Sequence, residues 1–198
     1  VERRADVRRI ASNPVMLTAL ALLHWNEKRM PEQRADLYES ILKWLALTRR
    51  RITEPVSAEG CILALQELAG AMQSHGKGRL VQADREWAAA QMAGQFQGDA
   101  GRALRFLADL EMDSGILVNR GTEVKFWHLT YQEYLAARVL SVTKDEERDK
   151  LLFTQGKAWE TEWKEVIQWL AGILRGQRVE RVEDLVSAAL DSFGEPLD

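Results

Sequence analysis

The residue types that catalysis needs do occur in this chain, but their spacing does not fit known reactions. Ser74–Gly78 contains glycine, lysine and serine, yet it is not the Gly-x-x-x-x-Gly-Lys-[Ser/Thr] loop that cradles phosphates. No Gly-x-Ser-x-Gly motif occurs. The three histidines are far apart, and the single cysteine, Cys61, stands alone, so no cluster has metal-ligand spacing. The sequence therefore gives no support for catalysis by this chain on its own.

His128 has the best position for binding an anion. It lies two residues before Thr130, and Thr130 with Glu133 matches the capping box that opens a helix. Backbone N–H groups and the macrodipole favour negative charge at a helix N-terminus. A lone histidine on an inward strand face is, however, usually an ordinary core residue. The residues alone leave both interpretations open.

The elements that must position His128 are mostly helical. In residues 1–54, Asn13 and Pro14 suit the N-cap and first position of a helix that continues as Val15 to Trp25. Pro31 opens a second helix, whose apolar positions recur at three- and four-residue steps. We expect these residues to form one helical unit.

Residues 55–143 have the order of a winged helix-turn-helix. Ser57 and Asp84 are the expected caps of the first two helices, and a third helix runs from Arg102 to about Asp113. The period then changes to that of a β-hairpin with its turn at residues 119–122. A helix from Thr130 to about Val142 follows, with an apolar face. That face consists of Tyr131, Tyr134, Leu135 and Val139.

Residues 144–198 are expected to form a second helical unit. Thr143 and Glu146 match a second capping box that would open it. Two amphipathic stripes follow: Trp163, Val166, Ile167, Leu170 and Ile173, then Val182, Leu185, Val186 and Ala189. The predicted fold class is thus mainly α: a helical unit, a winged helix-turn-helix with one β-hairpin, and a second helical unit.

Three stretches together resemble a known family. The segment Phe126 to Ala137, with His128 before Gln-Glu-Tyr-Leu-Ala-Ala, is similar to the winged-helix signature of NACHT proteins. The stretch Asn13 to Leu20, with Met30-Pro31 and Ala35-Asp36-Leu37-Tyr38, resembles the family's first helical domain. The stretch Trp163 to Ile167, with Leu170-Ala171-Gly172, looks like the helical domain after the winged helix. NACHT proteins are signal-transducing ATPases, and animal NLR receptors are relatives.

The resemblance implies a switch that closes over ADP and opens when ATP replaces it. It implies that Pro14 packs near the adenine and that His128 reaches the β-phosphate of ADP. ADP or ATP with Mg would be bound mainly by an upstream P-loop domain, which this sequence lacks. It further implies a regulatory module that acts on oligomerisation and effector signalling, a homo-oligomer on activation, and a cytoplasmic location. Pro14 alone proves nothing, because proline is common at the first helical position.

A DNA-binding winged helix is the alternative function. Charge argues against it, because residues 75–128 hold seven Lys/Arg and seven Asp/Glu. A DNA reader normally has a clear basic face. The predicted recognition helix carries Arg102 and Arg105 against Asp109, Glu111 and Asp113.

Composition sets the remaining limits. A chain of 198 residues can bury a sizeable core without disulfides. A lone cysteine fits a reducing compartment. The longest apolar run, Val15 to Leu23, is much shorter than the roughly 20 residues of a membrane span. Because the chain begins at Val1 in a helical pattern, we expect it to be a piece of a longer protein.

Overall fold

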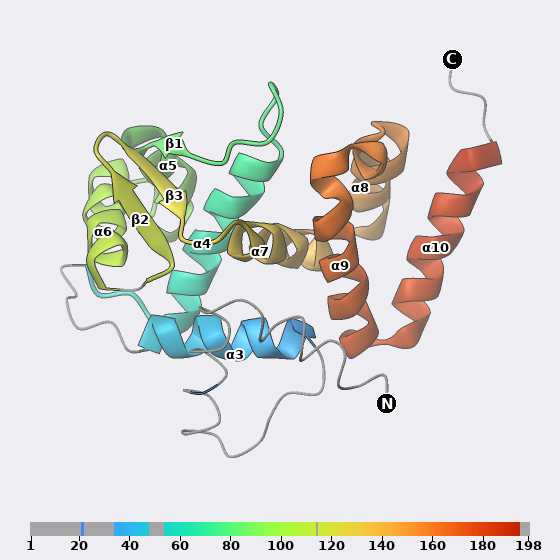
Figure 1. The fold of residues 1–198 in the computed structure, drawn as a ribbon, viewed down its shortest axis with the longest axis horizontal. Coiled ribbons are helices and arrows are strands. Elements are labelled where there is room, and N and C mark those ends of the chain that lie inside the picture. The colour runs from blue at the N-terminus through green and yellow to red at the C-terminus, as the bar shows by residue number, and fades with distance from the viewer. Residues whose placement is uncertain (1–20, 22–33, 48–53, 114, 195–198) are drawn as a thin grey trace.

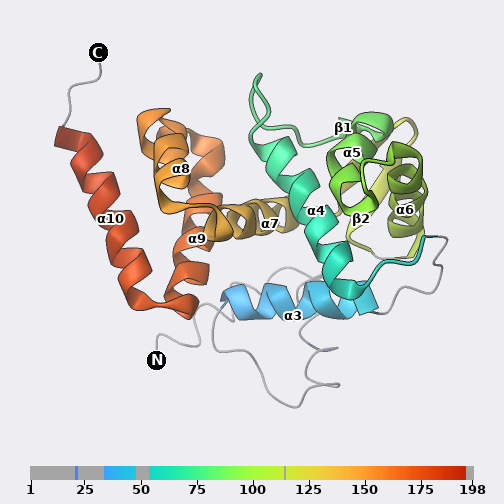
Figure 2. The ribbon, with the colours of Figure 1, turned by 180° about the vertical axis from the view of Figure 1, so that it is seen from behind.

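The computed structural model describes residues 21, 34–47, 54–113 and 115–194. These residues are mainly helical and include a small antiparallel sheet, which confirms the predicted fold class. In Figure 1, α4, α5, α6 and the sheet lie on one side, and α8, α9 and α10 lie on the other. Helix α7 lies between the two groups, and α3 (Arg34–Leu47) runs beneath them, as the reverse view in Figure 2 also shows.

The three helices of the winged-helix unit begin at the predicted caps or close to the predicted starts. Helix α4 (Ala58–Gln73) follows Ser57, whose hydroxyl accepts a hydrogen bond from the amide of Gly60 at 3.0 Å. Helix α5 (Arg85–Met92) follows Asp84, whose carboxylate accepts from two backbone amides in the first turn. A 3₁₀ turn (Ala93–Phe96) then leads to α6 (Ala100–Asp113). Side-chain oxygens at these positions satisfy amides that lack a partner within the helix.

The wing is the predicted hairpin. Strands β2 (Leu117–Arg120) and β3 (Glu123–Phe126) pair so that only Gly121 and Thr122 form the turn. Gly121 takes φ +76°, a conformation that such two-residue turns require. A third strand, β1 (Ala83–Asp84), pairs with β3 and was not predicted. Two residues are too short to show a strand's alternating pattern, so only tertiary pairing reveals β1.

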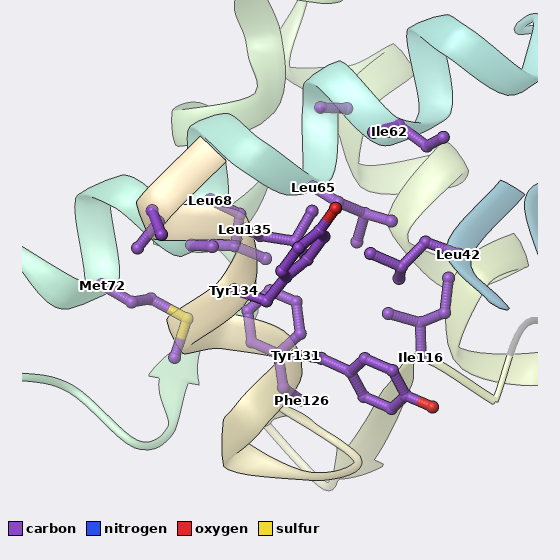
Figure 3. Packing of buried hydrophobic residues seen from close by; sticks show 14 of the residues in the cluster. Leu42, Ile62, Leu65, Leu68, Met72, Ile116, Phe126, Tyr131, Tyr134 and Leu135 are labelled. Atoms are coloured by element: carbon purple, nitrogen blue, oxygen red, sulfur yellow. The ribbon is translucent and has the colours of Figure 1, made fainter. Parts of the chain in front are cut away.

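Helix α7 (Leu129–Val142) is buried on nearly all sides, whereas the sequence predicted one apolar face. It packs against α4, α9, α3 and β3. Figure 3 shows its Tyr131, Tyr134 and Leu135 among side chains of α3, α4 and the wing. The additional buried residues are Gln132, Glu133, Ala136, Ala137, Leu140 and Ser141. Val139, which the sequence placed on the apolar face, is partly buried. It packs closely on Gly70 of α4, since a Cβ added at that glycine would lie 3.4 Å from the valine side chain.

The predicted start of α7 is wrong by two residues. His128, not Thr130, is the N-cap, and its Nδ1 accepts a hydrogen bond from the backbone amide of Thr130. Glu133 does not close a capping box, since its carboxylate pairs instead with Arg79 of the α4–β1 loop at 3.1 Å. The hydroxyl of Thr130 is taken by Tyr38 of α3. The cap has moved to His128, and the side chains of Thr130 and Glu133 contact residues far away in the sequence.

The second predicted capping box is also wrong. Thr143 is the C-cap of α7, and its hydroxyl donates to the carbonyl of Val139 at 2.9 Å. Lys144 occupies the N-cap position of α8 (Asp145–Asp149) with no side-chain capping bond. A π-helical turn (Lys150–Thr154) and two 3₁₀ turns (Lys157–Trp159 and Thr161–Trp163) lead to α9 and α10.

The two predicted amphipathic helices are α9 (Lys164–Gln177) and α10 (Val179–Gly194). Val166 and Leu170 of α9 are buried, as is Leu185 of α10. Val186 is 51% exposed, so the predicted stripe of α10 is narrower than expected. Helix α10 packs against α9 and the α8 region, so part of its surface is left uncovered.

Glu133 is the least expected member of the core, because it is a carboxylate only 5% exposed. Burial raises its pKa above the usual range, and the neighbouring Glu165 adds to the rise. The guanidinium groups of Arg79 and Arg34 oppose this effect. The core around the start of α7 therefore contains a carboxyl group whose charge opposes folding.

The first prediction concerns the packing of α7. We expect Leu135→Ala to lower the free energy of unfolding by about 2–5 kcal/mol, because Leu135 is fully buried and its removal leaves a cavity. Leu190→Ala in α10 is the matched control, since Leu190 is 63% exposed and should cost less than about 0.5 kcal/mol. Urea unfolding measures both. Equal losses would show that α7 is not the core of the fold.

The second prediction concerns pH. Below the ordinary glutamate value of 4.5, folded and unfolded chains both hold the Glu133 proton. As pH rises from there through the raised folded pKa, the unfolded chain releases its proton first, so the folded state loses stability. The loss amounts to about 1.4 kcal/mol for each unit by which the pKa is raised.

The measurement is the unfolding free energy of wild type minus that of Glu133→Gln, taken at several pH values. The difference should decrease as pH rises through this window, because contributions of the other carboxyl groups cancel between the two proteins. A difference that increases would mean that the ion pair with Arg79 outweighs burial.

Candidate functional site

His128 lies where the wing ends and α7 begins. The amide of Trp127 donates to the carbonyl of Ile116 at 2.8 Å, which continues the hairpin pairing one residue beyond β3. The amide of Tyr131 donates to the carbonyl of His128 at 3.0 Å. These bonds fix the backbone on both sides of the histidine. Its side chain is partly exposed, whereas the prediction placed it on the inward face of the strand with Val124 and Phe126.

A chain of hydrogen bonds joins His128 to the first helical unit. Tyr38 of α3 is 2% exposed, and its hydroxyl donates to Oγ1 of Thr130 at 2.9 Å. Oγ1 of Thr130 lies 2.8 Å from Nδ1 of His128. The backbone amide of Thr130 donates to the same Nδ1 at 3.3 Å. One threonine therefore contacts both the tyrosine and the histidine.

This arrangement determines which ring nitrogen carries the proton. Since a backbone amide can only donate, Nδ1 of His128 must be an acceptor. The Thr130 hydroxyl then donates its hydrogen to Nδ1 and accepts from Tyr38. In the neutral ring the proton is on Nε2, which becomes the hydrogen-bond donor of the side chain.

The α7 N-terminus offers an anion fewer backbone donors than the sequence suggested. The amides of Thr130 and Tyr131 are both bonded to His128. An anion at this point would therefore interact with the Nε2–H of the ring and with the dipole of α7. Among the described residues, the site thus places the His128 ring at the positive end of α7.

Charged residues near the site are paired with one another. Arg79 bonds to Glu133 at 3.1 Å, and Arg34 lies 3.5 Å from Glu165. The guanidinium of Arg34 also stacks 3.8 Å above the ring of Trp169, which holds it against α9. Two arginines and two glutamates leave this region without a large net charge.

Burial also affects Tyr38. It raises the pKa of the Tyr38 hydroxyl, although the hydrogen bond to Thr130 and the nearby Arg34 oppose the rise. The hydroxyl therefore stays protonated at neutral pH and keeps the hydrogen that it donates to Thr130.

Of the two predicted binding residues, the structure describes only His128. Pro14 lies outside the described residues, as does the predicted helix Val15 to Trp25 apart from residue 21. The sequence did not point to Tyr38 or Thr130 as partners of His128. Ninety-two positions separate Tyr38 from Thr130, so no local pattern could join them. The sequence offered one sign of such a pair: a tyrosine, whose hydroxyl usually needs a hydrogen-bond partner when the ring is buried.

Three arginines of α5 and α6 are paired with acids. Nε of Arg102 and Nε of Arg105 donate to the two oxygens of Glu54 at 3.0 and 2.7 Å. These hydrogen bonds, led by that of Arg102, lower the pKa of Glu54. Arg85 of α5 makes a two-point ion pair with Glu111 at 3.0 and 2.8 Å. Both arginines predicted on the recognition helix are therefore occupied.

The described residues also bear on metal binding and membrane insertion. No group of three or more His, Cys, Asp or Glu side chains within this part of the chain could hold a metal ion. Among the described helices, none combines the length and apolar character needed to cross a bilayer.

Comparison with known proteins identifies the fold's family. The model of the family described as "Winged helix-turn-helix domain C-terminal to NACHT" matches residues 16–140. Neither curated proteins nor solved structures gave a match to the chain. The matched residues run from before α3 almost to the end of α7, so they include His128 and the whole wing. The chain belongs to the family of winged helix-turn-helix domains that follow NACHT domains.

Proposed function

We propose that this chain is the regulatory module of a NACHT-type NTPase, which closes over ADP and transmits the nucleotide state to oligomerisation and effector signalling. The observation that carries the proposal is the geometry of His128. Its ring is held by Thr130 at the N-terminus of α7 and presents Nε2–H as a donor. Such a donor fits a phosphate oxygen, and a charge-assisted bond of this kind contributes about 1.5–3 kcal/mol.

The partner in this proposal is the upstream NACHT domain, which would bind ADP or ATP with Mg. Pro14 would pack near the adenine and His128 would reach the β-phosphate. Losing the histidine contact on opening would shift a two-state equilibrium, as a switch requires. A cytoplasmic location and assembly into a homo-oligomer on activation complete the proposal.

The packing of α7 supports the transmission step. Helix α7 starts at His128 and contacts α3, α4 and α9 along its buried length. A displacement at its N-terminus therefore reaches all three units of the chain, since close-packed interiors do not deform locally without cost. A phosphate contact at one end of α7 could in this way change the orientation of the second helical unit.

The third prediction tests the histidine. In the chain that includes its NACHT domain, His128→Ala should speed ADP release by about 10- to 100-fold, the effect of losing one charge-assisted bond. Release of a fluorescent ADP analogue measures this rate. His75→Ala is the matched control, because His75 lies in the turn after α4 and its ring faces that of Trp87 in α5, 6.1 Å away. Unchanged release in His128→Ala would refute the phosphate role.

No observation favours the DNA-binding alternative. The ion pairs of Arg102 and Arg105 with Glu54 use the charges that a recognition helix would present to phosphates. Specific binding to DNA depends on free Lys and Arg that release counterions.

The fourth prediction tests this alternative directly. We expect no binding of duplex DNA at micromolar protein and physiological salt. Glu54→Gln should raise weak, salt-sensitive binding above wild type, because it frees two arginines. Fluorescence anisotropy of a labelled duplex is the measurement. Salt-sensitive binding by the wild-type chain would restore the DNA hypothesis.

A further inference from the structure

The hydrogen bond between Tyr38 and Thr130 is not needed for His128 to donate to a phosphate. Tyr38 belongs to α3, whereas Thr130 and His128 belong to the start of α7. Capping of α7 requires only the bond from the Thr130 amide to His128. The Tyr38 hydroxyl therefore adds a bond that helix formation does not require. Tyr38 is also only 2% exposed, and the centre of its ring lies within 6 Å of the ring centres of Tyr131, Tyr134 and Trp169.

We propose that Tyr38 and Thr130 are positioning residues for His128, and that together they hold its ring in the Nε2–H tautomer. The use of this tautomer rests on the proposed function, whereas the tautomer itself depends only on residues of this chain. Tyr38 donates to Oγ1 of Thr130, which directs the threonine hydrogen toward Nδ1. The proton of the neutral ring is then held on Nε2.

The direction of each bond follows from its neighbours. The backbone amide of Thr130 makes Nδ1 an acceptor. The hydroxyl of Thr130 has one hydrogen and uses it on Nδ1 at 2.8 Å. Its oxygen remains free to accept, and the buried Tyr38 supplies the hydrogen. Reversing any of these bonds would place two donors or two acceptors opposite each other.

The hydrogen bonds from Tyr38 through Thr130 to His128, here called the relay, also couple two helical units. Movement of α3 away from α7 would remove the tyrosine hydrogen from Thr130, and the threonine hydroxyl could then turn away from the ring. Nδ1 of His128 would then lose its 2.8 Å contact and retain the longer bond to the backbone amide, at 3.3 Å. The position of α3 would thus control the donor that faces the phosphate.

The experiment is nitrogen NMR of the histidine rings in the 198-residue chain, at a pH of about 8, where an ordinary histidine is neutral. The chain has three histidines, and the His128 signals are those that His128→Gln removes. Wild type should show a protonated Nε2 and an unprotonated Nδ1. In Tyr38→Phe and Thr130→Val, the ratio of Nε2–H to Nδ1–H should fall by about two- to tenfold, the equilibrium effect of one hydrogen bond.

Two variants separate positioning from packing. Thr130→Ser keeps the hydroxyl and should restore the wild-type ratio. Tyr131→Phe removes a hydroxyl from the same aromatic cluster but makes no bond to Thr130 in the described contacts, so it should also match wild type. A protonated Nδ1 in wild type would overturn the inference. So would a Tyr38→Phe spectrum identical to wild type, or an equal change in Tyr131→Phe.

The same variants distinguish this inference from the proposed function. ADP release from the chain with its NACHT domain should accelerate in Tyr38→Phe, by less than in His128→Ala. If the tautomer changes while ADP release is unaffected even in His128→Ala, the positioning role stands and the phosphate role fails. If ADP release responds only to His128→Ala and the tautomer never changes, the relay is refuted and the phosphate role stands.

Discussion

The burial of α7 is the constraint on which the rest of the structure depends. A helix enclosed by α4, α9, α3 and the wing needs partners for the polar groups that it carries inside, and most of them have one. Among the described residues, Oε1 of Gln132 and the hydroxyl of Tyr134 have no hydrogen-bond partner. Gln132 donates to the carbonyl of Leu80, and Glu133 pairs with Arg79. Both partners lie in the segment between α4 and β1, so satisfying these two side chains fixes the position of that loop.

The same constraint links the three units of the chain. The loop that Glu133 holds is tied in turn to the segment before α9, because Arg79 and Gln73 both donate to the carbonyl of Glu162. Tyr38 joins α3 to α7 through its hydroxyl and joins α3 to α9 through the ring of Trp169, 4.4 Å away. Moving α3 away from α7, or the α4–β1 loop away from the segment before α9, would therefore break these polar bonds.

The contacts of His128 differ in detail from those that the sequence predicted. The sequence suggested a histidine beside a helix that was capped by threonine. The structure makes the histidine itself the cap and gives the threonine hydroxyl to a tyrosine of another helix. The donor proposed for phosphate and the cap of α7 are therefore the two nitrogens of one ring. This arrangement couples the helix start to whatever Nε2 contacts.

The sequence by itself determined the helices, the hairpin and the caps at Ser57 and Asp84, because these depend on residues a few positions apart. It also indicated the family through the segment around His128. Only the tertiary structure decided that α7 is buried on nearly all sides, that β1 exists, and that Thr130 and Glu133 have distant partners in place of those of a capping box. The reason is physical: the local pattern offers several bonds of similar energy, and burial against distant helices selects among them.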